Sequence, residues 1–368
     1  MLLSDICEII MGQSPSSDSY NVKGQGLPFF QGNADFGKLY PSVRLWCNCP
    51  IKKAEAGDLL VSVRAPIGAV NLANQKCCIG RGLAALRPYR DKCDAMYLYY
   101  LIKAGKNKLN WLGTGSTFKA ITRSSLLSFN VPDYCIAFQR KISGKLWSVD
   151  KLIHQRNEQL KLFDLLIQSR FLEMFGEPWV NDKEFPCYSV GQVAESVTYG
   201  TSAPASDSGQ YEYLRMNNLT DNGQLDLSDL KRIDMSDEQA EKYMVKKGDI
   251  LFNRTNSIDL VGKTALFNLN NPMIIAGYLI RIRLSDKVNP VYFVAYMNMP
   301  YMKEKLRNIA KGAVNQANIN SKELKSIQIL IPPLSLQNEY CNFVLSIDKS
   351  KYREAVFLYL LEDVLHML

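Results

Sequence analysis

Few residues of this chain have the types and spacing that catalysis requires. Val261-Gly262-Lys263-Thr264 resembles the end of a phosphate-binding loop, but Ser257 stands where such a loop has its first glycine. The ALFNL that follows is predicted to be a strand, whereas a phosphate cradle needs a helix N-terminus there. Glu323 and Lys325 have the E-x-K spacing of metal-dependent nucleases, without a preceding aspartate in a clear strand. These fragments do not define an active site.

The cysteines and asparagines point to no other chemistry. Cys47, Cys49, Cys77 and Cys78 show C-x-C and C-C spacings instead of the C-x₂-C of zinc sites, and the chain has only 2 histidines. The total of 9 cysteines is odd and does not recur between the halves, which disfavours a disulfide framework. No N-P-P-aromatic tetrad of adenine methyltransferases occurs. We therefore predict free thiols, no metal and no catalytic residue, with a four-thiolate zinc site as the alternative.

Charge is distributed unevenly over the 368 residues. The net charge is +8, and residues 1–135 hold 16 basic and 9 acidic side chains, whereas residues 177–334 hold 18 of each. A basic first half suits a polyanion such as DNA, although a solvated surface without a partner could carry the same excess. The first residues, MLLSDICEII, lack the basic start of a signal peptide, and no apolar run is long enough to span a membrane. We expect a cytoplasmic protein.

The sequence segments that would position functional residues occur twice in the chain. GDLLVSVR (57–64) returns as GDILFNRT (248–255), 191 residues later. Gly12-Gln13-Ser14 is echoed by Gly200-Thr201-Ser202, and Gln139 by Gln337. Solenoid repeats have periods of roughly 20–50 residues, so this repeat is a whole module. A duplicated module can hold two similar or adjacent targets at a fixed separation.

Each module ends in a helix pattern. Between Cys135 and Phe175, apolar residues alternate at steps of four and three, which predicts a long helix with a heptad seam. A second seam follows Ser335, a plausible N-cap. The two helices most simply pair with each other, antiparallel. The alternative is that each helix packs on its own module as ordinary core.

Several blocks of sequence, in this order, resemble the DNA-specificity (S) subunits of type I restriction–modification enzymes. The blocks are LLSDICEIIMGQSP (2–15), GDLLVSVRAPIG (57–68), CIGRGLAAL (78–86), SRFLEMFGEP (169–178), GDILFNRTNS (248–257), LVGKTALF (260–267) and IPPLSLQ (331–337). One departure is Pro132, which is followed by Asp133-Tyr134 where the second module has Pro333-Leu334.

The resemblance implies an α+β fold with an internal pseudo-two-fold repeat. Two target-recognition domains (1–134 and 179–334) would be joined by antiparallel coiled-coil spacer helices (135–178 and 335–368). Each domain would read half of a split sequence in double-stranded DNA. The implied partners are two methyltransferase subunits and motor–nuclease restriction subunits, with no membrane. S-adenosylmethionine, ATP and Mg would be bound by those partners, so no cofactor is expected on this chain. The competing classes are a stand-alone nuclease or methyltransferase and a structural coiled-coil adaptor.

Forked or amide side chains near glycine turns are the best candidates for reading base edges, because bases present paired donors and acceptors. Many of these candidate side chains could instead form structural ion pairs or cap turns. The predicted DNA-binding residues are Gln13, Ser14, Arg64, Arg81, Lys119, Thr201, Asn217, Arg254, Lys263, Asn315 and Gln316. The glycine-containing loops GTGSTF (113–118) and KGAVNQ (311–316) occupy equivalent places in the two modules.

Overall fold

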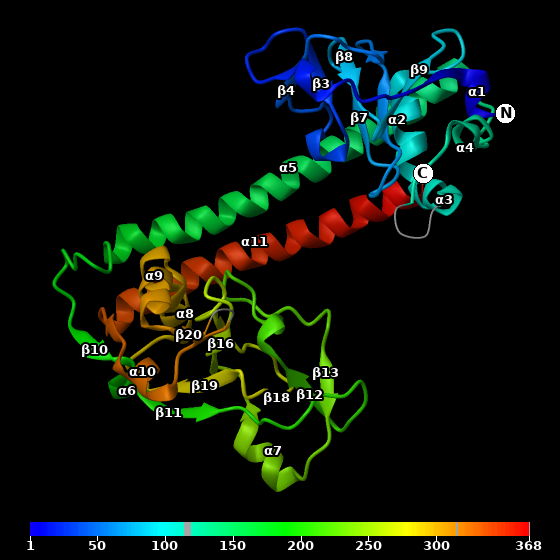
Figure 1. Ribbon diagram of the computed structural model, residues 1–368. Helices are drawn as coiled ribbons and strands as arrows, with labels where there is room; N and C mark the ends of the chain where they lie inside the picture. The colour runs from blue at the N-terminus through cyan, green and yellow to red at the C-terminus, as the bar shows by residue number, and fades with distance from the viewer. Residues whose placement is uncertain (114–118, 314–315, 368) are drawn as a thin grey trace. The chain divides into compact units, whose positions relative to one another are not determined.

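The structure is a computed structural model that describes residues 1–113, 119–313 and 316–367. It divides into two compact units: unit 1 runs from Met1 to Gln155 and includes the C-terminal residues from Leu358 on, and unit 2 runs from Arg156 to Phe357. The division falls inside the two long helices, α5 (Ile136–Phe175) and α11 (Leu334–Met367) (Figure 1). Each of these helices contributes residues to both units.

Unit 1 is built on two sheets. One is antiparallel, in the order β1 (Cys7–Met11), β9 (Leu83–Pro88), β6 (Leu59–Ser62), β7 (Val70–Leu72). The other has the order β2 (Tyr20–Asn21), β4 (Leu45–Cys47), β3 (Leu27–Phe30), β8 (Cys77–Ile79), β5 (Lys53–Ala54), with β3 and β8 parallel. Besides α5, its α-helices are α1 (Leu3–Ile6), α2 (Ala95–Ala104), α3 (Lys106–Leu112) and α4 (Arg123–Leu127), and short 3₁₀ turns cover Ser17–Ser19 and Asn33–Asp35.

Unit 2 repeats this plan. Its antiparallel sheet has the order β11 (Ala194–Tyr199), β19 (Leu279–Leu284), β15 (Ile250–Asn253), β17 (Thr264–Leu266). Its second sheet has the order β13 (Lys231–Ile233), β12 (Tyr211–Leu214), β18 (Met273–Ile275), β14 (Met244–Val245), again with one parallel pair, β12 and β18. Smaller sheets join β16 (Thr255–Asn256), β21 (Gln316–Asn318) and β20 (Lys311–Ala313), and pair β10 (Cys187–Ser189) with β22 (Gln328–Leu330). The helices are α6 (Val190–Val193), α7 (Asp237–Tyr243), α8 (Pro290–Asn298), α9 (Pro300–Ile309) and α10 (Ser321–Ser326), with a 3₁₀ turn at Met216–Asn218.

Matching polar contacts support the duplication in detail. Asp58 is 2% exposed and pairs with Arg87, and Asp249 is 5% exposed and pairs with Arg283. In both pairs the aspartate directly precedes an inner strand, β6 or β15, and the arginine lies on the neighbouring strand, β9 or β19. Two buried carboxylates need compensating partners, and the fold supplies the same partner twice.

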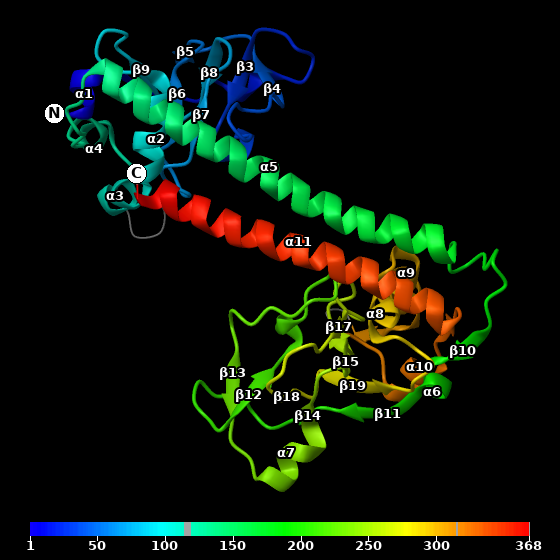
Figure 2. The ribbon, with the colours of Figure 1, turned by 180° about the vertical axis from the view of Figure 1, so that it is seen from behind.

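An aromatic cluster fixes the long helices to unit 2. Phe171 and Phe175 of α5 pack against Tyr340 of α11, with ring centroids 5.5 Å apart in both pairs. Both phenylalanines also contact Tyr292 of α8, which lies next to α11 (Figure 2). The end of α5 and the beginning of α11 are therefore part of the hydrophobic core of unit 2. Gly176, at φ 71°, ends α5 in the left-handed conformation that favours glycine.

The two long helices also pair with each other within unit 2. Arg156 bonds to Glu354 at 3.1 Å, Asp164 to Lys351 at 2.6 Å and Arg170 to Glu339 at 2.9 Å. Residue numbers rise along one helix as they fall along the other, so the pairing is antiparallel. Arg156 and Arg170, two basic residues within the apolar seam of α5, thus form ion pairs with α11. Among the residues described, no helix combines the length and apolar character that a membrane crossing needs.

Candidate nucleic-acid interface

Four predicted residues of unit 1 lie close together at the surface. Ser14, Arg64 and Arg81 line a hollow of about 300 Å³ together with Tyr20, Gln31 and Gly82. Gln13 precedes Ser14 with its side chain exposed. Four separate chain segments thus bring two guanidinium groups and an amide to one place.

Tight backbone packing positions these segments. Gly12 donates to the carbonyl of Leu83, and Gln13 to that of Ile79, so the segment crosses the ends of two strands. A Cβ on Gly12 would lie 2.2 Å from the carbonyl oxygen of Gly80, which requires glycine at this position. This glycine therefore serves the packing of the fold. The Arg81 amide then donates to Ser14 Oγ at 3.2 Å, which fixes the arginine at the hollow's edge.

The charge of the hollow is uncompensated. Within the described part of the chain, neither Arg64 nor Arg81 forms an ion pair, and both are exposed. The alternative that these arginines are structural ion pairs is therefore wrong for the described residues. A guanidinium can donate two parallel hydrogen bonds to guanine O6 and N7, and an amide such as that of Gln31 can bond to adenine. The hollow has the chemistry of a surface that reads base edges.

Lys119 lies beside the same surface. The next residue, Ala120, forms an antiparallel β-bridge with Arg64. The Lys119 side chain is exposed. The rest of the loop GTGSTF, residues 114–118, is outside the described residues. Lys119 thus adds a cation near Arg64 in space, although the two residues are far apart in sequence.

In unit 2, Arg254 occupies a different position from Arg64. Its backbone donates to Tyr278 and accepts from Ile319, as that of Val63 does with Gly82 and Ile121, so Arg254 corresponds to Val63. The guanidinium stacks on Tyr199, 4.9 Å from the ring centroid, and donates to the Gly277 carbonyl at 3.3 Å. Arg254 is therefore held in place before any ligand binds.

Lys263 belongs to a cluster of cations around the loop that precedes β17. Its ammonium group bonds to Asp221 at 3.1 Å and to the Leu219 carbonyl at 3.3 Å, and 13% of its side chain is exposed. Lys303 of α9 donates to the Gly262 carbonyl of the same loop at 3.3 Å. Burial, together with repulsion from Lys263 and Arg307, lowers the pKa of Lys303 to about 8. Three cations share one carboxylate here, so the cluster favours an anion such as a phosphate.

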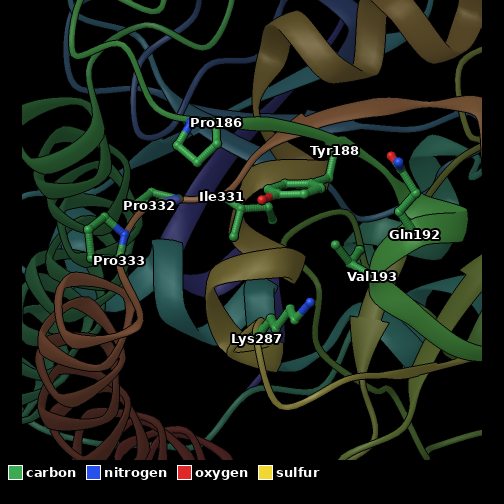
Figure 3. Close-up of a pocket in the computed structure, with 8 residues that line it drawn as sticks. All are labelled: Pro186, Tyr188, Gln192, Val193, Lys287, Ile331, Pro332 and Pro333. Atoms are coloured by element: carbon green, nitrogen blue, oxygen red, sulfur yellow. The ribbon is translucent and has the colours of Figure 1, made fainter.

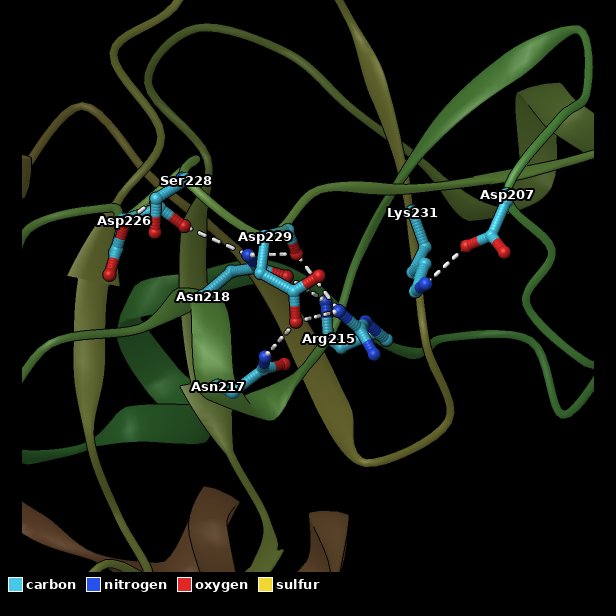
Figure 4. A network of polar contacts seen from close by, with 8 residues as sticks. All are labelled: Asp207, Arg215, Asn217, Asn218, Asp226, Ser228, Asp229 and Lys231. Carbon is cyan, nitrogen blue, oxygen red and sulfur yellow. Dashed lines mark hydrogen bonds and ion pairs between the residues drawn. The ribbon is translucent and has the colours of Figure 1, made fainter. Parts of the chain in front are cut away.

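The remaining predicted residues of unit 2 have structural roles or exposed side chains. Thr201 is 8% exposed and its hydroxyl accepts from the Ala203 amide at 3.2 Å, so it is part of the fold and does not face solvent. Asn217 is exposed but donates to Asp229 at 3.2 Å, in a network that also holds Arg215 (Figure 4). Gln316 is exposed at the start of β21. Asn315 lies outside the described residues.

A larger hollow in unit 2 does not fit a polyanion. It has a volume of about 450 Å³ and is lined mainly by prolines and apolar side chains, with Lys287 as its one cation (Figure 3). Its walls are Pro186, Tyr188, Gln192, Val193, Lys287, Ile331, Pro332 and Pro333. Size alone therefore does not identify the interface.

Sequence reasoning missed Tyr20, Gln31 and Lys303. Tyr20 begins β2 and Gln31 directly follows β3, and the parallel pairing of β3 with β8 brings Gln31 to the hollow. The two sequence fragments that resembled catalytic motifs have structural roles instead. Thr264 begins strand β17, and Glu323 caps α10 by accepting from the Asn320 amide. No group of metal-ligating side chains was found among the described residues.

Two copies of one α+β module, each with a basic surface, are the arrangement expected of a tandem nucleic-acid-binding protein. The family model of the type I restriction modification DNA specificity domain matches residues 1–162 and 183–353, so the chain belongs to this family.

Individual relatives agree with this assignment. The chain is 44% identical over 152 residues to a Methanocaldococcus jannaschii protein described as the MjaX type I restriction enzyme specificity subunit, covering 41% of this chain and 36% of the relative. It is 25% identical over 285 residues to the EcoKI specificity subunit of Escherichia coli K12, covering 72% of this chain and 60% of the relative. The matches thus span less than two thirds of these relatives.

The fold is shared along the whole chain. The crystal structure of a type I restriction–modification S subunit from M. genitalium superposes with a TM-score of 0.60 at 13% identity, covering 100% of this chain and 93% of the other. The likeness concerns the arrangement of elements only, since at this identity the side chains at the two surfaces are free to differ.

Proposed function

We propose that this chain recognises a two-part sequence in double-stranded DNA, with one half read by each unit. The observation that carries the proposal is that each copy of the repeated fold has a basic surface. In unit 1 it is the hollow with Arg64 and Arg81, and in unit 2 it is the surface around Arg254, Lys263 and Lys303. A duplicated reader requires two half-sites, because each module contacts only a short stretch of duplex.

The long helices act in this proposal as an antiparallel spacer. Ion pairs and the aromatic cluster join α5 and α11 within unit 2, and Gln139 and Gln337 fix the start of each helix to its own module. A helix rises about 1.5 Å per residue, so the length of α5 and α11 sets the number of unread base pairs between the half-sites. The relatives are described as specificity subunits of type I restriction enzymes, which supports a role inside such a complex.

Catalysis belongs, in the proposal, to partner subunits. Two methyltransferase subunits would bring S-adenosylmethionine, and motor–nuclease subunits would bring ATP and Mg. This chain would select the site and hold those subunits there, in the cytoplasm where the host DNA lies. Its described residues supply cations, amides and aromatic rings suited to holding DNA.

A methylation assay tests this division of labour. The purified chain, alone and with the methyltransferase subunits of its own system, is incubated with host DNA from a strain lacking the system. We expect adenine methylation only when both components are present. Methylation by this chain alone would contradict the scaffold role, and methylation by the partners alone at the same sites would contradict its role in selecting them.

A further inference from the structure

Trp111 is the most exposed large hydrophobic side chain among the described residues. It is 89% exposed, on the short helix α3. Leu109 of the same helix is 0% exposed and belongs to the core of unit 1. Because successive helix residues are about 100° apart, two residues of separation place Trp111 opposite its buried neighbour. The helix is thus anchored by one face and presents an indole to solvent on the other.

The surroundings of Trp111 are purely cationic in sequence. From Ala95 to Pro132 the chain has no aspartate or glutamate and five basic residues: Lys103, Lys106, Lys108, Lys119 and Arg123. Lys103 is paired with Asp150, and Lys108 lies 5.0 Å from the ring centroid of Phe129. A bare aromatic ring among cations suits a ligand with both negative charge and flat apolar faces. Nucleic acid has both.

The helix adjoins the hollow of unit 1. Gly113 follows α3, and a Cβ placed on it would lie 3.6 Å from Lys119 Cβ and 2.9 Å from Ile67 Cδ1. Lys119 precedes Ala120, which bridges to Arg64, and Arg64 lines the hollow. Trp111 therefore lies on a helix whose C-terminal end adjoins Lys119, the residue before the one that bridges to Arg64.

Unit 2 offers a control residue. Asn308 is exposed near the end of α9, the helix that follows α8 in unit 2 as α3 follows α2 in unit 1. It carries no aromatic ring, so its replacement tests whether any change at an exposed position of such a helix alters DNA binding.

We propose that Trp111 makes an apolar contact with a base or deoxyribose of duplex DNA, next to the bases that Arg64 and Arg81 read. This inference rests on the proposed function. Architectural DNA-binding proteins use apolar side chains in this way, and an indole on a base face adds affinity without adding charge. The contact would increase the affinity of unit 1 for DNA and leave the number of neutralised phosphates unchanged.

The test compares variants of the full chain in complex with its methyltransferase subunits. The probe is a duplex that contains the sequence methylated by this system, with a scrambled duplex as reference. Trp111→Ala is expected to raise the Kd for the specific duplex roughly 5- to 100-fold, the range for removal of one aromatic–base contact. Trp111→Phe should retain most of the affinity, and Asn308→Ala should change it by less than about twofold. The slope of log Kd against log salt should stay as in the wild type for Trp111→Ala, because no cation is removed.

Photo-crosslinking provides a second measurement on the unaltered protein. A specific duplex substituted with 5-bromodeoxyuridine is irradiated with the complex, and the crosslinked peptide is identified by mass spectrometry. We expect the peptide that contains Trp111. Wild-type affinity of Trp111→Ala without a crosslink there would overturn the inference. So would loss of the methyltransferase subunits at unchanged DNA affinity, since Trp111 would then be a protein contact. A wild-type complex that does not distinguish the specific from the scrambled duplex would instead refute the proposed function, and the inference with it.

Discussion

Gln139 and Gln337 make the same three hydrogen bonds in the two units. The Oε1 atom accepts from the amide of Asp94 at 3.0 Å in unit 1 and from that of Asn289 at 2.8 Å in unit 2. The Nε2 atom donates to two carbonyls in each case, those of Lys92 and Tyr134 or those of Lys287 and Pro332. Both side chains are buried, at 2% and 0% exposure. One residue type thus ties the start of each long helix to its globular part.

Replacing either glutamine with methionine should destabilise its unit. Methionine has nearly the same shape but leaves three backbone groups unpaired, at about 1–3 kcal/mol each for groups that stay buried. We expect Gln139→Met or Gln337→Met to lower the free energy of unfolding by roughly 2–5 kcal/mol. Urea unfolding measures the change. Gln168→Met, at an exposed position of α5, is the control. Equal effects at the control and the buried positions would show that the hydrogen bonds are unimportant.

Substituting the arginines of the hollow should weaken binding to the specific sequence. Arg64→Ala or Arg81→Ala should cost about 1–3 kcal/mol on the true site if that arginine reads a guanine, and should relax specificity at one base pair. A uniform loss over all sequences, with a salt slope smaller by about 1, would identify a phosphate contact instead. Arg90→Ala is the control, because Arg90 is exposed beyond the opposite end of β9. Wild-type binding by both hollow variants would remove the hollow from the interface.

The lowered pKa of Lys303 predicts a dependence of stability on pH. A lysine whose pKa is lower in the folded state, here about 8 against an ordinary 10.5, binds its proton less tightly when folded. The free energy of unfolding should therefore rise as pH increases from about 8 to 10.5, and be lowest, for this group, below pH 8. Lys303→Met should raise stability at pH 7 and abolish that rise.

Urea unfolding at several pH values measures the effect, with Lys322→Met, on the exposed face of α10, as the control. If Lys303 also contacts a phosphate, Lys303→Met should reduce the salt slope of DNA binding by about 1 while stabilising the fold. A stability profile of Lys303→Met that follows the wild type would show that Lys303 is not desolvated.

The length of the helices should set the gap between half-sites. One extra heptad adds about 10 Å, or three base pairs, when inserted in α5 and matched in α11. We expect the methylated half-sites to move apart by about three base pairs. Insertion in α5 alone should disrupt the pairing and reduce modification. A matched pair of insertions that leaves the gap unchanged would contradict the role of the helices as a spacer.

Periodicity and repetition made the larger features predictable. The alternation of apolar residues predicted the helices that the structure places at Ile136–Phe175 and Leu334–Met367. Both alternatives for the helices hold in unit 2, where α11 pairs with α5 and also packs on its own module. Repeated glycines located the turn at Gly12 and Gly200, since local backbone requirements leave a direct mark on sequence.

Side-chain environment was not predictable in the same way. Thr201 is buried because the loop closes over it, with its carbonyl accepting from Gly277 and from the Tyr213 hydroxyl. Lys263 is paired with Asp221, which is distant in sequence. The exposure of Trp111 depends on how Leu109 packs. Each of these follows from tertiary contacts, which a single sequence does not display.

The most direct test of two-part recognition is single-base mapping of modified adenines in cells that carry the complete system. We predict one motif made of two short specific parts separated by a gap of fixed length and no preference, lost when this chain is deleted. Exchange of unit 2 surface residues Arg254 and Lys263 for alanine should alter one part and leave the other intact. A single uninterrupted motif, or the same two-part motif without this chain, would contradict the account.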